Sequence, residues 1–282
     1  MMKSRRLAIA RLILLECLLH PVTSITVHEY AARPIVQKAL ASPQRPESVL
    51  SFFFAGVDYN DAAQVDDILR NGACLQIMQP LWWTGDPEYD ALCRGFSETV
   101  RQVGKTGSFG SSKDDSGVLS QIDKTMSELI LCDQLSRNCS RGEAEAFAYE
   151  PIAIQAARSI AEEALGSLKV GCITDKGEIY PPYLSFCATA MMHSESLADH
   201  DLAVKVIELG KAFSPSQVKR FFELQMGMEL AHMDVIKRFG RFPHRNDALG
   251  RQNTSEEALW LSDYDNLPAW AKSQMKSSGK KL

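Results

Sequence analysis

Apolar positions recur at steps of three and four residues through the second half of the chain, which is the spacing of one buried face of an α-helix. The first such series, downstream of Ser120, consists of Ile122, Met126, Leu129 and Ile130. Pro151 begins the next helix, because proline is favoured in a first turn, and Gly166 lies near its end. Its apolar positions are Ile154, Ala157, Ile160, Ala161 and Ala164. The pattern predicts consecutive helices rather than alternating strands and helices.

Proline, glycine and capping residues mark the limits of further helices. Asp86 before Pro87 predicts a helix N-terminus, and that helix runs to about Val103. Helices are also expected after Pro181–Pro182, from Asp199 or His200 to Gly210, from Ser214–Pro215 to about Phe239, and after a capping box of Thr254 and Glu257. The fold class is therefore all-α, with antiparallel helices joined by short connections. Such helices form either a closed bundle or a curved superhelix of stacked pairs.

The composition along the chain predicts one domain, over residues 47–268, with a flexible Gly/Ser-rich insertion near residues 104–117. Residues 1–46 are expected to form a leader and linker outside the fold, and residues 269–282 a basic disordered tail. Basic residues precede an apolar run that Glu16 interrupts, a pattern that suggests organellar or secretory targeting; otherwise we expect a cytoplasmic protein. No apolar stretch reaches the roughly 18 to 20 residues of a spanning helix, so no transmembrane segment is predicted.

Composition narrows the functional classes. Hydrophobic residues make up 45% of the 282 positions, as in a globular protein. The net charge of -4 argues against nucleic-acid binding driven by the overall charge of the protein. The seven cysteines include no C-x-x-C pair, which predicts free thiols rather than a zinc ribbon. Gly104-Lys105-Thr106 resembles the end of a phosphate-binding loop, but Thr99 stands where that loop requires glycine. We therefore predict no nucleic-acid partner and no cofactor.

Charged and polar residues are concentrated in three segments of the helical region. These segments are DQLSRNCSRG at 133–142, HSESLADH at 193–200 and RFGRFPHRNDALGR at 238–251. They resemble the D-Q-x-x-R-N-x-x-R-G, H-S-E-x-x-x-D-Q and R-F-G-R-F-P-H-R-N-x-x-L-G-R motifs of the bacterial domain-of-unknown-function family 924. His200 stands where that family has Gln, and the resemblance extends from about Val49 to Leu261. It implies a tetratricopeptide-like superhelix of antiparallel helix pairs, and no activity, because none is established for the family.

Arginine is concentrated in the first and third segments, and guanidinium groups bind carboxylates and phosphates through paired hydrogen bonds. This chemistry predicts a site for a small anionic molecule. The candidate ligand-binding residues are Asp133, Arg137, Asn138, Arg141, Arg238, Arg241, Arg245, Asn246 and Arg251. The alternative is a network in which the same arginines pair with Asp133, Glu195, Asp199 and Asp201 and tie helices together.

Proton transfer is the chemistry that the same segments could add, and His193, Glu195 and His244 are the candidate catalytic residues. His193 is not expected to activate the adjacent Ser194, because neighbouring residues on a helix diverge by about 100°. On a continuous helix His193 and His200 lie roughly 10 Å apart, too far to share a zinc ion. Glu229 and His232 form a single Glu-x-x-His pair, whereas di-iron bundles use two. No metal site is predicted.

Two functions follow from these features. The first is an Arg/His-rich pocket that binds a small anionic molecule, with acid–base catalysis on it if a reaction occurs. The alternative is a tetratricopeptide-like interaction module that holds a peptide or a partner protein in its concave groove.

Overall fold

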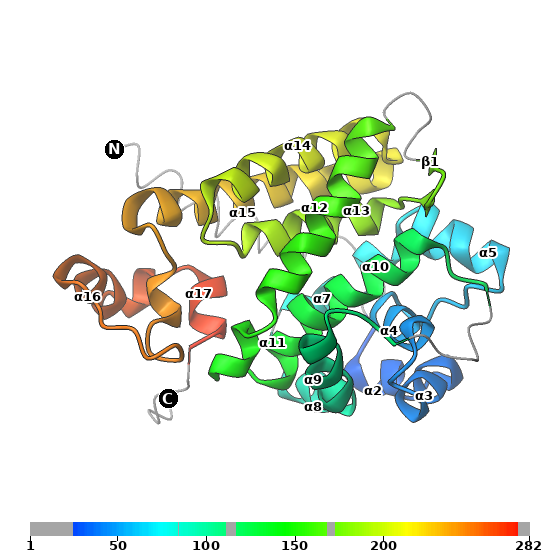
Figure 1. Cartoon of the computed structure of the whole chain (residues 1–282), viewed down its shortest axis with the longest axis horizontal. Coiled ribbons are helices and arrows are strands. Elements are labelled where there is room, and N and C mark those ends of the chain that lie inside the picture. Colours follow the sequence, from blue (N-terminus) through cyan, green and yellow to red (C-terminus); the bar gives the residue numbers. More distant parts are fainter. Residues whose placement is uncertain (1–24, 84, 111–116, 168–172, 276–282) are drawn as a thin grey trace.

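The computed structural model describes residues 25–83, 85–110, 117–167 and 173–275. These residues form helices joined by turns, together with one short hairpin, so the fold is all-α as the sequence predicts (Figure 1). The hairpin pairs β1 (Ile173–Thr174) antiparallel with β2 (Gly177–Glu178), with Ile173 opposite Glu178.

The first half of the chain folds into short helices around a cluster of aromatic side chains. Phe52, Phe53 and Phe54 are fully buried, and the ring of Phe53 stacks on Trp82 with 4.9 Å between centroids. Trp82 and Trp83 therefore pack within or beside the core. The α-helices of this half are α2 (Val27–Ala31), α3 (Pro34–Ala41), α4 (Pro46–Phe53), α5 (Ala62–Gln64), α6 (Ala73–Ile77), α7 (Gln79–Trp83), α8 (Pro87–Cys93), α9 (Ser97–Thr106), α10 (Gln121–Leu129) and α11 (Ser136–Cys139).

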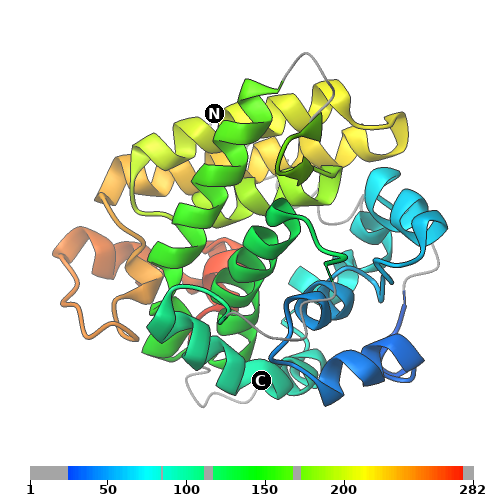
Figure 2. The same ribbon diagram turned by 45° about the vertical axis from the view of Figure 1, so that its right-hand side comes forward.

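The second half contains the longer helices, in which each helix packs on its neighbour in sequence. They are α12 (Glu150–Gly166), α13 (Pro181–Met192), α14 (Leu197–Phe213) and α15 (Ser216–Phe239), followed by α16 (Ser255–Ser262) and α17 (Ala269–Ser273). Helices α12 to α15 pack against one another, and α13 is buried among them along almost its whole length (Figures 1 and 2). The tetratricopeptide-like superhelix, and the peptide-binding groove that depends on it, stay predictions.

Local sequence signals explain where several helices begin. Asp86 caps α8 by accepting hydrogen bonds from the backbone N–H groups of Glu88 and Tyr89. Thr254 and Glu257 form both hydrogen bonds of the expected capping box at α16. The predicted helix starts at Pro151, Pro181 and Ser214–Pro215 agree with the starts of α12, α13 and α15 to within two residues.

Two π-helical turns interrupt the helices in a way that apolar spacing did not predict. They span Val65–Arg70 and Ile130–Leu135, and 3-10 turns occupy Arg94–Phe96, Ala144–Phe147, Pro243–Arg245 and Tyr264–Asn266. The second π-turn joins α10 to α11 without a loop. Because a π-turn inserts an extra residue, it shifts the helix phase and brings polar residues to the buried side. Every residue from Ile130 to Asn138 is buried.

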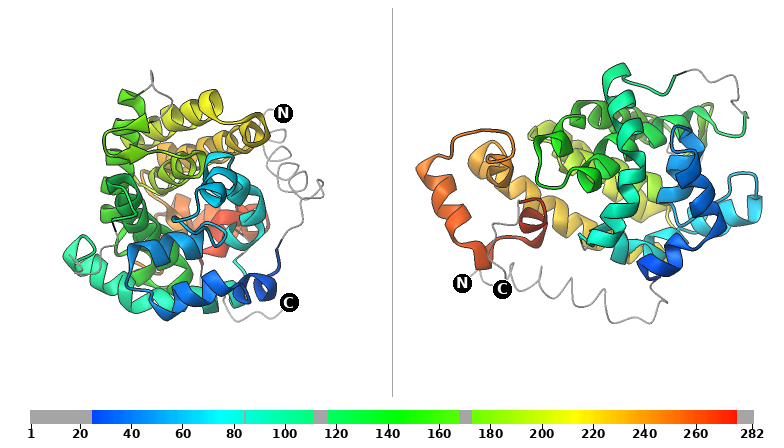
Figure 3. Two further views of the ribbon diagram at one scale, coloured as in Figure 1. Left: turned by 90° about the vertical axis from the view of Figure 1, so that its right-hand side faces the viewer. Right: turned by 90° about the horizontal axis from the view of Figure 1, so that it is seen from below.

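The packed structure extends beyond the limits of 47 and 268 that the sequence analysis sets. Thr26 and Glu29 form a capping box at α2, and the Tyr30 ring is buried against Phe52 and Tyr89. Near the other end, α17 packs through the buried Ala271. In the right-hand view of Figure 3, α16 and α17 lie at the opposite end of the molecule from α2 and α3. Three parts of the sequence predictions lie outside the described residues: the targeting segment, residues 111–116 of the expected insertion, and residues 276–282 of the expected tail.

Candidate functional site

The first polar segment enters the site through the π-turn between α10 and α11. Asp133 is fully buried, and Arg137, which lies four residues later and is 4% exposed, forms an ion pair with its carboxylate. Arg137 Nη2 also donates to Glu150 Oε1 at 2.8 Å. Glu150 begins α12, and it belongs to none of the three segments. Burial leaves these charges little alternative to pairing with one another.

The second segment forms the turn between α13 and α14. The helix breaks after Met192, and His193 caps its C-terminus. His193 Nδ1 lies 2.9 and 3.1 Å from the two carboxylate oxygens of Asp133. Because a carboxylate only accepts, Nδ1 is the protonated ring nitrogen, and the lone pair of the neutral imidazole is on Nε2. This is the arrangement of a general base held in one tautomer.

A buried hydrogen-bond network holds this turn in place. His200 is fully buried; its Nε2 donates to the backbone oxygen of Ser194 at 2.9 Å, and its Nδ1 lies 2.5 Å from Glu229 Oε1. Ser194 Oγ donates to Asp199 at 2.6 Å, and Asp199 pairs with Arg158. Ser194 is thus occupied in fixing the loop, consistent with the expectation that His193 does not activate it.

The third segment begins in the last turn of α15, and Gly240 ends that helix with a φ of 71°, a left-handed backbone that favours glycine. Arg245 is 3% exposed and donates to both carboxylate oxygens of Glu150, at 3.0 and 3.2 Å. Its Nη2 donates to the backbone oxygen of His193 at 2.8 Å. Glu150 therefore joins Arg137 of the first segment to Arg245 of the third, and Arg245 contacts the second. The three segments meet at one place.

The other predicted residues of the second and third segments form a neighbouring network of ion pairs. Arg251 pairs with Glu195 at 2.8 and 3.0 Å, and Glu195 also accepts from the backbone N–H of Phe242 at 2.8 Å. Arg241 pairs with Glu257 at 2.6 and 2.8 Å. Asn246 is fully buried, and its Nδ2 donates to Asn253 at 2.7 Å and contacts Glu257 at 3.4 Å.

Two predicted arginines lie apart from both groups. Arg238 forms a half-exposed ion pair with Glu256 at 2.7 Å. Arg141 pairs with Asp90 at 2.7 and 2.9 Å and contacts Asn138 Oδ1 at 3.3 Å. Each of the six predicted arginines thus has a carboxylate partner, as the network alternative expects. Of the four acids named for that alternative, Asp133 and Glu195 pair with predicted arginines, whereas Asp199 pairs with Arg158.

Burial and charge set the protonation states around His193. Burial raises the pKa of the Asp133 carboxyl, but Arg137 and His193 lower it by more, so that it stays ionised. Burial lowers the pKa of His193; Asp133 opposes this change, and Arg137 and Arg245 add to it. Burial also lowers the pKa of His232 and of His244 well below the ordinary value. The three imidazoles are therefore neutral at neutral pH.

An aromatic group borders these histidines. The indole of Trp270 stacks on the His232 ring with 3.8 Å between centroids and an interplanar angle of 24°. The same indole meets the rings of Phe242 and His244 edge-on, at 5.8 and 5.3 Å. His232 Nδ1 donates to the backbone oxygen of Met228 at 2.8 Å. Sequence analysis did not identify Trp270 or Glu150, because neither belongs to a charged motif.

Some polar atoms of this region have no partner. His244 Nδ1 and Arg245 Nε are buried and form no hydrogen bond with any described residue. Buried donors and acceptors are normally satisfied, so such atoms identify places where a further group can bind. The described residues contain no group of three or more His, Cys, Asp or Glu side chains placed to hold a metal ion. Among the described residues, no helix combines the length and apolar character needed to cross a membrane.

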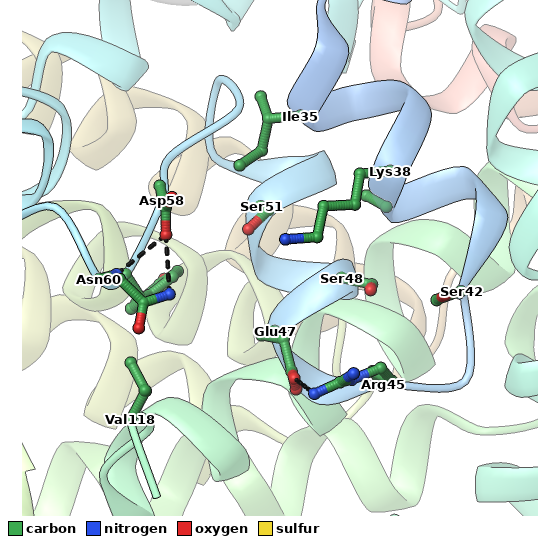
Figure 4. A pocket seen from close by; sticks show the side chains of 12 residues that line it. Ile35, Lys38, Ser42, Arg45, Glu47, Ser48, Ser51, Asp58, Asn60 and Val118 are labelled. Atoms are coloured by element: carbon green, nitrogen blue, oxygen red, sulfur yellow. Dashed lines mark hydrogen bonds and ion pairs between the residues drawn. The ribbon is translucent and has the colours of Figure 1, made fainter. Parts of the chain in front are cut away.

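A separate cavity of about 160 Å³ lies beside α3 and α4. Lys38 of α3 extends toward Ser51 of α4, and Asp58 lies across from them (Figure 4). The Asp58 carboxylate accepts hydrogen bonds from the backbone and side chain of Asn60, each at 3.0 Å. None of the three polar segments lines this cavity.

Cys74, Cys93, Cys132, Cys139 and Cys187 are free thiols, as predicted, and Cys17 and Cys172 lie outside the described residues. Burial raises the pKa of Cys139 to about 11 and that of Cys132 to about 12. These thiols are therefore protonated and packed in the interior or beside it.

Comparisons with known proteins agree with the resemblance found in the motifs. Residues 49–265 match the model of a family described as "Bacterial protein of unknown function (DUF924)". Among solved structures, one described as "Structure of Protein of Unknown Function ATU0120 from Agrobacterium tumefaciens" is 24% identical with a TM-score of 0.44. The match covers 64% of this chain and 88% of that one. No curated protein matches.

Proposed function

The chain belongs to this bacterial family of unknown function, DUF924, so its function has to be inferred from the residues of the site. We propose that the protein binds a small anionic molecule beside His193. Arg245 and His244 contact the anion, and the Asp133–His193 pair transfers a proton to or from it. The observation that carries the proposal is the hydrogen bond from His193 Nδ1 to Asp133, which leaves Nε2 free to take up a proton.

The charges of the site support coupling between anion binding and protonation. Two guanidinium groups, of Arg137 and Arg245, balance the two carboxylates of Asp133 and Glu150. The histidines beside them are neutral, so an entering anion adds one uncompensated negative charge. His193 compensates it by taking up a proton at Nε2, because the anion raises the pKa that burial had lowered. Binding therefore strengthens as the pH falls toward 6.

The unpartnered polar atoms support a ligand at this place. Arg245 Nε and His244 Nδ1 have no partner among the described residues, although both side chains are more than nine-tenths buried. Arg245 Nε is a donor, which suits an anionic oxygen. The ring of His244 lies 5.5 Å from that of Phe242, and the Arg245 guanidinium covers the same Phe242 ring at 4.5 Å. The two unpartnered atoms thus belong to side chains that pack on one shared ring.

The remaining predicted residues brace the site in this proposal. Glu195 pairs with Arg251, so it positions the third segment rather than transferring a proton. Arg241 ties the same segment to the start of α16. Asn138 and Arg141 belong to the first segment and contact α8, so they anchor that segment on the side facing the first half of the chain.

Isothermal titration of the full chain with acetate and with phosphate tests the proposal. Measurements in two buffers of different ionisation enthalpy give the number of protons taken up. We expect uptake approaching one proton per anion and tighter binding at pH 6 than at pH 8. His193→Gln should abolish the uptake, whereas His28→Gln, at an exposed position on α2, should leave it unchanged. Absence of binding by both anions, or uptake that His193→Gln does not alter, would overturn the proposal.

A further inference from the structure

The Trp270 indole occupies a box whose three walls are the rings of His232, Phe242 and His244. It stacks on His232 at 3.8 Å and meets the other two rings edge-on. Stacked and edge-to-face contacts are the two favourable arrangements of aromatic rings. The box is thus shaped to receive a flat ring, and α17 supplies that ring in this structure.

The walls and the occupant differ in how firmly they are held. His232 lies within the 24-residue helix α15, and Phe242 is fully buried with its backbone bonded to Glu195 and Arg251. Trp270 belongs to the five-residue helix α17, and so short a helix is not stable without its packing contacts. A hydrogen bond of 3.3 Å from Arg141 to the backbone oxygen of Ser273, together with the buried Ala271, holds α17 in place. The walls therefore belong to a longer or more extensively bonded part of the structure than the occupant does.

The chemistry around the box is more polar than an indole requires. The Arg245 guanidinium lies 4.5 Å from the centroid of Phe242, one wall of the box, and 4.9 Å from the centroid of Phe147, which is not part of the box. Its Nε and the Nδ1 of His244 have no hydrogen-bond partner among the described residues. Trp270 brings no negative charge to them. A ring that carried a carboxylate would fill the box and also supply an acceptor.

We propose that the His232–Phe242–His244 box is a subsite for the ring of a planar aromatic carboxylate, and that α17 covers this subsite until such a ligand displaces Trp270. The proposal rests on the anion site of the preceding subsection and names the class of its ligand. The ligand ring stacks on His232 in place of the indole, and its carboxylate lies toward Arg245 and His244. The ring stacking is thus the same for ligand and indole, whereas the carboxylate forms interactions that the indole does not offer.

Two probes of the same ring and different charge test the proposal on the full chain. Indole-3-acetate carries a carboxylate, and indole-3-ethanol carries a neutral hydroxyl on the same ring. In the Trp270→Ala variant, we expect indole-3-acetate to bind at least about tenfold more tightly than indole-3-ethanol, because only the carboxylate pairs with the guanidinium. Indole-3-acetate should also bind the variant more tightly than the unmodified chain, where it must displace Trp270.

Trp260→Ala is the matched control. Trp260 packs on Phe239 in the same part of the molecule, and no ring contact among the described residues joins it to the three walls, so its removal should leave both affinities as in the unmodified chain. If the Trp270→Ala variant binds the two probes with equal affinity, the box is a cavity that does not recognise the carboxylate. If the variant binds neither probe, the box is not a subsite. Either result overturns the proposal. If Trp270→Ala loses its helical circular dichroism, Trp270→Leu, which keeps an apolar contact, takes its place with the same criteria.

The outcome is separable from that of the acetate and phosphate titrations. Proton uptake through His193 with no preference for the aromatic carboxylate would retain the anion site and remove the subsite. A strong preference for indole-3-acetate with no proton uptake would retain the subsite and remove the role of His193.

Discussion

Glu150 is the residue whose replacement tests the described network most directly. Its carboxylate is the acceptor for Arg137 at 2.8 Å and for Arg245 at 3.0 and 3.2 Å, and both guanidiniums are at most 5% exposed. Glu150→Gln keeps the shape and one acceptor oxygen but leaves two buried positive charges facing a single carboxylate, that of Asp133. Removing one partner of a buried ion pair costs about 3–5 kcal/mol.

The expected cost is smaller than that range because the Glu150 side chain is 16% exposed and the amide oxygen still accepts. We expect Glu150→Gln to lower the free energy of unfolding by about 2–4 kcal/mol. For a chain of 282 residues, that loss corresponds to a decrease in Tm of roughly 3–7 °C. Urea unfolding followed by far-ultraviolet circular dichroism measures the free energy, and a constant m-value shows that the unfolded state has not changed.

Glu145→Gln is the matched control, since it makes the same chemical change five residues earlier. Glu145 also pairs with an arginine, Arg101, at 2.9 Å, but these side chains are 34% and 46% exposed. An exposed pair contributes no more than about 1 kcal/mol. Equal free-energy losses for the two variants would refute the argument that the shared carboxylate balances two buried charges.

Two further predictions concern histidine burial and glycine packing. Burial lowers the pKa of His244, so the unfolded chain binds the proton more readily, and stability should fall as the pH drops below about 6.5. His244→Gln should make that fall shallower in urea titrations from pH 7.5 to 5, whereas a slope as steep as that of His28→Gln would contradict the assignment. A Cβ at Gly210 would lie 2.3 Å from the Phe222 ring, so Gly210→Ala should destabilise the fold by about 1–3 kcal/mol. Gly166→Ala, with no atom within 4 Å, should be neutral or stabilising in the same thermal unfolding assay, and equal effects of the two would exclude the steric cause.

The helix boundaries were largely predictable because they depend on neighbouring residues. Asp86 caps α8, and Thr254 with Glu257 caps α16, through contacts that span three positions. The same kind of signal is present at Thr26 and Glu29, where a capping box begins α2, although the composition of residues 1–46 predicts a leader and linker there. Local capping therefore carried more information than the composition of the first 46 residues.

The sequence predicts most residues of the site but not which of them pair with one another. The three charged segments do meet, yet the residue that joins two of them, Glu150, is an isolated acid in the sequence. The π-turn over 130–135 changes which residues face inward, and a phase shift of one residue resembles the ordinary alternation of three- and four-residue steps in a helix. Partners between distant segments depend on tertiary packing, which local periodicity does not encode.

The position of Glu150 along the chain also sets the order in which its two ion pairs can form during synthesis. One of its partners, Arg137, lies 13 residues earlier, and the other, Arg245, lies 95 residues later. A ribosome adding about 5–20 residues per second needs roughly 5–20 s to make that interval. Until Arg245 has been made, Arg137 is the one buried partner of the two that is available to Glu150, and a product that terminates before Arg245 lacks the other.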